Sequence, residues 1–274
     1  MKALILRGPL PQSFLDYFGH ALLRLILTIQ GLGAFMLISL GVMFSKMGTA
    51  RQVLRPLLLT QVLRSGLQLL PMVTFLSAAL GLVVIGQTVS LMTRLGANQY
   101  LGLVMVTAVV RELGPMLAAL LVLSRVGAAN VIELGTARAL GEVEALEALG
   151  IDPIHYLVVP RILGMALGVF SLTIYLLLGA LVSGYLWAFL QDVPIRPSEY
   201  IQQLAGAFRG LDFILIAVKT GFFGMAIATV TCYHGLAQPL RLEEVSQATV
   251  RAMAQAVVLC VLLDALFILV YLVA

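Results

Sequence analysis

The sequence predicts an all-α protein that crosses a membrane several times, and its composition and apolar pattern support this. Of its 274 residues, 61% are hydrophobic and only 11% are charged, and the mean hydropathy is +1.05. Soluble domains are about 45–50% apolar and about 25% charged, and disordered chains are less apolar still. The apolar residues form long continuous runs, whereas a transmembrane β-barrel shows short alternating segments. These observations exclude a water-soluble domain and indicate a polytopic helical membrane protein.

Five apolar segments are long enough to cross a bilayer, which takes about 20 helical residues. They are residues 72–92, 101–123, 160–190, 213–233 and 253–273. A sixth run, residues 21–44, also has the length, but it contains Arg24, Gln30 and three glycines. This run forms a helix that either spans the membrane or lies on its surface. We therefore divide the chain into an N-terminal region, residues 1–66, and a transmembrane domain, residues 67–274.

The basic residues predict the orientation of these spans. The chain has a net charge of +4, and its arginines and lysines lie between apolar segments, without the aromatic residues that favour nucleic-acid binding. Alternate connections differ in basic content, and the richer set is expected in the cytoplasm. That set is Lys46, Arg51, Arg55, Arg64, Arg125, Arg138, Arg161, Arg241 and Arg251, against Arg94, Arg196 and Arg209 on the other side. The C-terminus then lies on the far side of the membrane.

One cytoplasmic connection, residues 133–153, predicts an acidic amphipathic helix over residues 133–150. Its composition favours a helix, its apolar residues recur every three positions, and Gly150 and Pro153 predict its end. Arg138 and Glu142 are spaced to pair. A helix that rests on lipid headgroups is usually basic, so docking to a protein partner is the favoured interpretation and a headgroup-bound helix the alternative. The candidate docking residues are Glu133, Arg138, Glu142, Glu144, Glu147 and Asp152.

Four charged residues fall well inside predicted spans, where an unpaired charge costs several kcal/mol, while Arg161 stands at the edge of its segment and is expected outside the membrane core. Arg111 and Glu112 precede Pro115, which removes a backbone hydrogen bond and kinks a helix. They serve either in a structural ion pair that joins helices or as the polar part of a cavity that receives a headgroup. Lys219 and Asp264 are single opposite charges in the last two spans. We predict a salt bridge between them, with ion or proton coupling as the alternative role.

No motif in the chain predicts catalysis or metal binding. His20, His155 and His234 are far apart in the sequence, and no metal-ligand spacing links them. The two cysteines lie in apolar stretches and are expected to be packing residues. Neither a phosphate-binding Walker A loop nor a hydrolase motif is present. We predict a protein that is not an enzyme, with any ATP hydrolysis performed by a partner.

Residues 110–153, VRELGPMLAALLVLSRVGAANVIELGTARALGEVEALEALGIDP, resemble the signature region of the MlaE/YrbE permease family. The specific matches are RELGP, the small-residue turn SRVGAA, and the ending ALEALGIDP. Weaker similarity continues through Lys219 and QATVRAMAQAVVLCVLLDALF, so the resemblance covers about residues 60–274. The stretch HGLAQPLRLEEVSQAT departs from the family, in which this link is often rich in glycine pairs.

The resemblance implies the membrane subunit of an ABC transporter in the bacterial inner membrane. In that family a homodimer is driven by two cytoplasmic ABC ATPases, which bind ATP and Mg and engage the loop helix. A periplasmic ring of MCE domains exchanges phospholipid with the permease and maintains outer-membrane lipid asymmetry. The permease itself holds no cofactor.

By position relative to RELGP, the resemblance also implies a substrate cavity. Its wall would include Val84, Leu91, Met92 and Leu95, with Arg111 and Glu112 near its polar part. From the residues alone, the four apolar side chains are equally well explained as lipid-facing or packing surface. The alternative function is an ion-coupled secondary transporter or channel that uses Lys219, Asp264 and Glu112.

Overall fold

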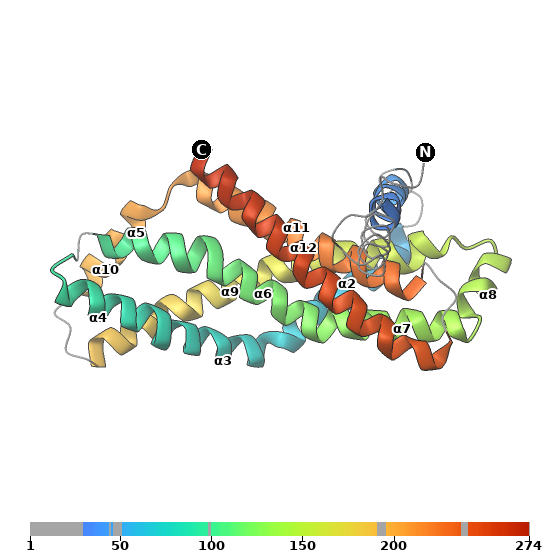
Figure 1. Ribbon diagram of the computed structural model, residues 1–274, viewed down its shortest axis with the longest axis horizontal. Coiled ribbons are helices and arrows are strands. Elements are labelled where there is room, and N and C mark those ends of the chain that lie inside the picture. The colour runs from blue at the N-terminus through green and yellow to red at the C-terminus, as the bar shows by residue number, and fades with distance from the viewer. Residues whose placement is uncertain are drawn as a thin grey trace, which may run out of the picture.

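Long helices form nearly the whole of the described chain. The computed structural model describes residues 30–43, 45, 51–97, 100–190, 196–236 and 241–273, and no strand occurs among them. Five helices are long and apolar enough to cross a membrane, and they run along the length of the molecule (Figure 1). The predicted all-α fold with five spans is therefore confirmed.

The spans continue beyond the apolar segments that predicted them. They run Arg55–Arg94, Leu101–Ala139, Ile154–Leu190, Gly210–Leu236 and Leu242–Tyr271. The first has 40 residues, roughly 60 Å at 1.5 Å per residue, against a hydrocarbon core of about 30 Å. The helices therefore project out of the membrane, because polar residues such as Arg55 and Glu133 continue the same helical turns. The expected border between residues 66 and 67 falls inside the first span.

Each span consists mainly of α-helices, whose bounds differ by a few residues from those of the span. The first contains α2 (Arg51–Ser65), α3 (Leu70–Leu80) and α4 (Gly86–Arg94), and the second contains α5 (Leu101–Met105), α6 (Gly114–Val122) and α7 (Ala128–Ala139). The last three contain α9 (Val159–Leu190), α11 (Gly210–Leu236) and α12 (Val245–Val273). Two short helices, α8 (Glu142–Ala148) and α10 (Pro197–Ala207), join spans. They lie at opposite ends of the bundle (Figure 1), which we call the α8 end and the α10 end.

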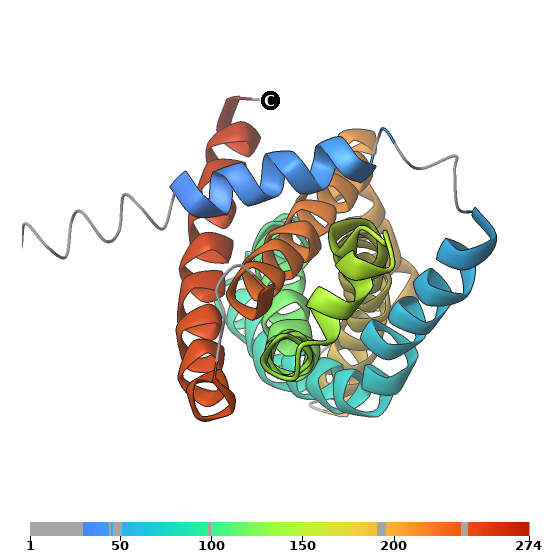
Figure 2. The same ribbon diagram turned by 90° about the vertical axis from the view of Figure 1, so that its right-hand side faces the viewer.

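A further apolar helix, Gln30–Met43, lies near the α8 end. Figure 2, which looks at that end, shows this helix lying across the long helices. Phe35 packs edge-on against Tyr233, with ring centroids 5.8 Å apart, while Leu37 is 72% exposed. This crosswise position favours a surface helix over a sixth span for the described part of the predicted run. Residues 21–29 and 44 of that run lie outside the described residues.

α9 is the central helix of the bundle, in contact with α2, α3, α6 and α11. Small residues allow these contacts to be close. Ser65 Oγ donates a hydrogen bond to the Gly164 carbonyl at 2.9 Å, and Gly81 lies directly against Ala180, Ser183 and Gly184. Because lipid is as apolar as the helices, close packing of small residues is a main source of helix association in membranes.

Several spans contain π-helical turns, which are wider than α-helical turns and frequently occur at functional sites. In the second span they cover Val106–Leu113 and Leu123–Gly127. The first carries Arg111 and Glu112, and the second carries Arg125. Three of the five charged residues of this span therefore lie in its π-helical turns, and the other two, Glu133 and Arg138, lie in α7.

The prediction of one continuous helix over residues 133–150 is wrong, because two separate helices cover this stretch. Residues up to Ala139 belong to α7 and thus to the second span, and α8 begins only at Glu142. Gly141 has φ 78° and Gly150 has φ 75°, a left-handed conformation that glycine adopts without steric strain. These two glycines bound α8. The predicted Arg138–Glu142 pair is also replaced, because Arg138 Nε lies 3.3 Å from Glu144 Oε1.

The glycine contact between the first span and α9 predicts a large effect of one methyl group. In Gly81→Ala the added Cβ would overlap the backbone of α9, and overpacking of this kind costs about 1–3 kcal/mol. Gly221→Ala is the matched control, because it lies in a helix with open space around it and gains about 0.5–1 kcal/mol of helix propensity. Thermal unfolding in detergent should give a lower Tm for the first variant only. Equal Tm values would contradict the close approach.

Candidate functional site

Arg111 and Glu112 of the second span lie beside a break in its backbone hydrogen bonding. Pro115 has no N–H to donate to the carbonyl four residues earlier, which is that of Arg111. Lys219 Nζ, from α11, donates a hydrogen bond to this carbonyl at 2.8 Å. The proline thus leaves a backbone acceptor that a side chain of another span uses.

Lys219 links three spans through its ammonium group. Its Nζ donates to Glu112 Oε2 at 2.7 Å and lies 2.7 Å from Asp264 Oδ1 of α12. The contact with Asp264 is an ion pair without the angles of a directed hydrogen bond, so the bond to Glu112 is the better aligned of the two. The Lys219 side chain is 0% exposed. A fully buried ammonium is tolerable only with such compensation.

Arg111 forms a second ion pair nearby. Its Nη2 lies 3.0 Å from Asp212 Oδ1, and its guanidinium stands over the Tyr271 ring at 5.2 Å from the centroid. Asp212 is buried and also accepts a hydrogen bond from the Arg209 backbone N–H at 2.8 Å, at the start of α11. The sequence did not indicate Asp212, because it stands just before the predicted apolar segment.

These two pairs form one network, which we call the central charge network: Arg111, Glu112, Asp212, Lys219, Asp264 and Tyr271. Both Arg111 and Lys219 approach the Tyr271 ring. From the sequence, Glu112 is expected in either a structural ion pair or a cavity, and Lys219 in a salt bridge with Asp264; the structure brings these three residues together. It gives the Arg111 charge a carboxylate partner, so an anionic ligand would have to compete with Asp212.

The four apolar residues expected in the cavity wall lie on one stretch of the first span. Val84 belongs to the π-helical turn Gly81–Ile85, Leu91 and Met92 belong to α4, and Leu95 follows it. Leu91 and Leu95 are 54% and 67% exposed, while Val84 and Met92 are half-buried against the core. Their common surface is therefore available to lipid or to another chain, and their role as a substrate wall stays a prediction.

A second group of ion pairs lies toward the α8 end. Arg64 of α2 makes two hydrogen bonds to the Glu133 carboxylate, one of them at 2.8 Å. Arg161 of α9 lies 3.4 Å from the same carboxylate and donates a hydrogen bond to Asn130 Oδ1 at 3.4 Å. Glu133 therefore connects the first three spans and differs from the other predicted docking residues, which lie on or beside α8.

α8 presents most of the predicted docking residues. Val143 is buried and anchors the helix, while Glu142, Glu144 and Glu147 are exposed. Asp152 Oδ1 accepts a hydrogen bond from the Ile154 backbone N–H at 3.0 Å, where the third span begins. α8 is thus a short acidic connector between the ends of the second and third spans.

Comparison with known proteins places this arrangement in a family. The family described as Permease MlaE matches residues 58–270. The chain belongs to the MlaE permease family. The match includes nearly the whole of the five spans and every residue of the central charge network except Tyr271, and it leaves out the crosswise helix Gln30–Met43.

Bacterial relatives of this MlaE-family chain carry ABC permease names. A "Probable ABC transporter permease protein" of Rickettsia felis is 30% identical over 244 residues, covering 86% of this chain and 90% of the relative. The Arabidopsis thaliana protein TRIGALACTOSYLDIACYLGLYCEROL 1, chloroplastic, is 30% identical over 202 residues, covering 73% of this chain and 57% of that protein. A probable permease of Synechocystis is 32% identical over 162 residues, 57% of this chain and 59% of its own length.

The central charge network predicts a specific pattern of stability. Lys219→Met should destabilise the protein by about 3–5 kcal/mol, because it leaves Glu112 and Asp264 without their buried cation. The combined variant Lys219→Met, Glu112→Gln, Asp264→Asn removes both charges as well and should recover most of that loss. Unfolding in detergent, followed by circular dichroism, measures both. If the combined variant is no more stable than Lys219→Met, the unpaired carboxylates are not the cause of the lost stability.

Proposed function

We propose that this chain is the permease subunit of an ABC transporter that moves phospholipids between the bacterial inner membrane and a periplasmic MCE-domain carrier, which maintains outer-membrane lipid asymmetry. Membership of the MlaE family is the observation that carries the proposal. A homodimer of the chain with two cytoplasmic ATPases is the expected assembly. The ATPases would bind ATP and Mg, and this chain would move the lipid.

The geometry of α8 supports docking of an ATPase. Its carboxylates are exposed, and its two ends are joined within a few residues to the helices Leu101–Ala139 and Ile154–Leu190. A displacement of α8 would therefore act directly on both spans. An acidic connector also requires a basic or mixed surface on its partner.

Two observations support a lipid as the cargo. The Arabidopsis relative is named after a galactosylated diacylglycerol, which is a lipid. The first span exposes large apolar side chains toward the α10 end, among them Leu91 and Leu95, and acyl chains need such a surface. The α10 end is the side expected to face the MCE carrier.

The alternative, ion-coupled transport, draws on the buried Lys219 and on its partly buried partners Glu112 and Asp264. In the structure these three are joined in one compact pairing across three spans, which serves helix association as well as it would serve an ion path. In an ion-coupled transporter, an imposed ion gradient would drive substrate flux without an ATPase. A permease subunit would require the ATPase and ATP.

Docking at α8 predicts a loss of ATPase capture after charge reversal. Glu142→Lys combined with Glu147→Lys should reduce capture of the ATPase in a pull-down at least tenfold, equivalent to about 1.4 kcal/mol, because like charges then face each other. Glu199→Lys is the control, since Glu199 is an exposed acid of α10 at the other end of the bundle. Equal capture by all three proteins would remove α8 from the interface.

Lipid transfer between the reconstituted transporter and the carrier should require ATP and the ATPase.

In the same assay, Arg111→Gln should lower the rate of lipid transfer, and the double variant Arg111→Gln, Asp212→Asn separates two causes. If Arg111 contacts the cargo, the double variant stays impaired. If Arg111 only neutralises Asp212, the double variant recovers. ATP-independent transfer driven by an ion gradient would instead establish the alternative function.

A further inference from the structure

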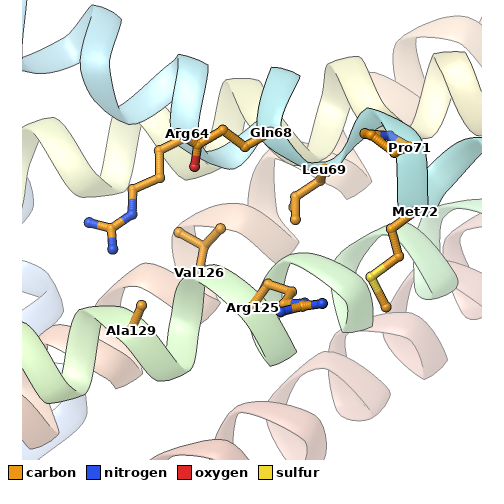
Figure 3. Close-up of a pocket in the computed structure, with 8 residues that line it drawn as sticks. All are labelled: Arg64, Gln68, Leu69, Pro71, Met72, Arg125, Val126 and Ala129. Atoms are coloured by element: carbon orange, nitrogen blue, oxygen red, sulfur yellow. The ribbon is translucent and has the colours of Figure 1, made fainter.

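A cavity between the first two spans is separate from the central charge network. Its volume is about 420 Å³, and it is lined by Arg64, Gln68, Leu69, Pro71, Met72, Arg125, Val126 and Ala129 (Figure 3). α2, the turn after it and the start of α3 form one side. The π-helical turn Leu123–Gly127 and the first residues of α7 form the other.

The two arginines occupy opposite ends of this cavity. Figure 3 shows the Arg64 guanidinium near Ala129 and the Arg125 guanidinium turned toward Met72, with Leu69 and Val126 between them. Arg64 is paired with Glu133, which follows Arg125 by eight residues of the same helix. At 1.5 Å per residue, Arg125 therefore lies about 12 Å deeper along the bundle than that ion pair.

The cavity has an excess of positive charge. Arg64 and Arg161 share the single carboxylate of Glu133. Arg125 is exposed and makes no hydrogen bond or ion pair with any residue that the structure describes. A guanidinium without a counter-ion attracts an anion, and its planar donors suit the oxygens of a phosphate.

The surroundings of Arg125 are those of a membrane boundary. Arg125 follows the apolar segment 101–123 by two residues. Beside the cavity the first span exposes Leu67 (59%) and Phe75 (78%), and the lining residue Met72 is itself 42% exposed. A cationic cavity beside an exposed apolar strip matches a ligand with a phosphate at one end and acyl chains at the other.

We propose that this cavity binds the phosphate group of an anionic phospholipid in the leaflet at the α8 end, with Arg125 as the principal contact and Gln68 as a further donor. The excess positive charge favours lipids with a net negative charge over zwitterionic lipids, whose own cation would lie near the arginines. The proposal does not depend on which lipid the transporter moves. It differs from an arginine that merely reaches the headgroup layer, because the cavity walls also take part.

Native mass spectrometry of the purified full chain in detergent can test the site, with phosphatidylglycerol, phosphatidylcholine and inorganic phosphate as probes. We expect phosphatidylglycerol to bind more tightly than phosphatidylcholine, and Arg125→Gln to weaken that binding about tenfold, as for a lost charged hydrogen bond. Arg251→Gln is the matched control, because Arg251 is exposed at the same end but outside the cavity. It should bind as the unmodified chain does.

A second variant tests the cavity without changing its charge. Ala129→Trp should fill the space and weaken phosphatidylglycerol binding, while a Tm close to that of the unmodified chain shows that the fold is kept. Equal weakening by Arg125→Gln and Arg251→Gln, or unchanged binding in Ala129→Trp with an unchanged Tm, would overturn the proposal in favour of general surface charge. Displacement of the lipid by millimolar inorganic phosphate would overturn it in favour of a soluble phosphate.

Discussion

A single buried ammonium group holds the second, fourth and fifth spans in register. Lys219 reaches the Arg111 carbonyl, Glu112 and Asp264 from the middle of α11. A charged side chain that lies alone in an apolar environment destabilises the fold. The three helices must therefore pack together for Lys219, Glu112 and Asp264 to be neutralised. This requirement gives the packing a direction that apolar contacts lack, since apolar side chains are as well placed against lipid as against protein.

The local backbone is adapted to that interaction. Arg111 and Glu112 are adjacent in the sequence but pair with different residues, Asp212 and Lys219. They lie in the wide π-helical turn Val106–Leu113, just before Pro115. Tyr271 lies beside both cations and joins the end of α12 to the network. A displacement of any one of these helices would therefore alter the ion pairs of the others. Such coupling between helices suits a permease that moves between conformational states.

The two ends of the bundle differ in what they offer. The α8 end has the acidic connector, the Arg64–Glu133–Arg161 cluster and the cationic cavity, while the α10 end has exposed apolar surface on α4. Glu133 links the cavity to the acidic connector, since it neutralises Arg64 of the cavity and belongs to the helix that leads to α8. Lipid bound at Arg125 would thus lie on the same helix that an ATPase would displace, which connects the two proposals physically.

The sequence alone determined the five spans and the opposite charges that must find partners, because hydropathy and the cost of a buried charge depend on composition and length. It also pointed to Pro115 as a break and to an acidic connection after the second span. It did not determine that Gly141 divides this connection, because a glycine within a helical pattern is often tolerated. The tertiary structure decided the partners that the sequence did not predict: Asp212 for Arg111, Glu112 in addition to the predicted Asp264 for Lys219, and Glu133 for Arg64, which is 69 residues away. Such pairs depend on which helix faces lie together, and apolar faces of similar composition do not specify this before the chain is folded.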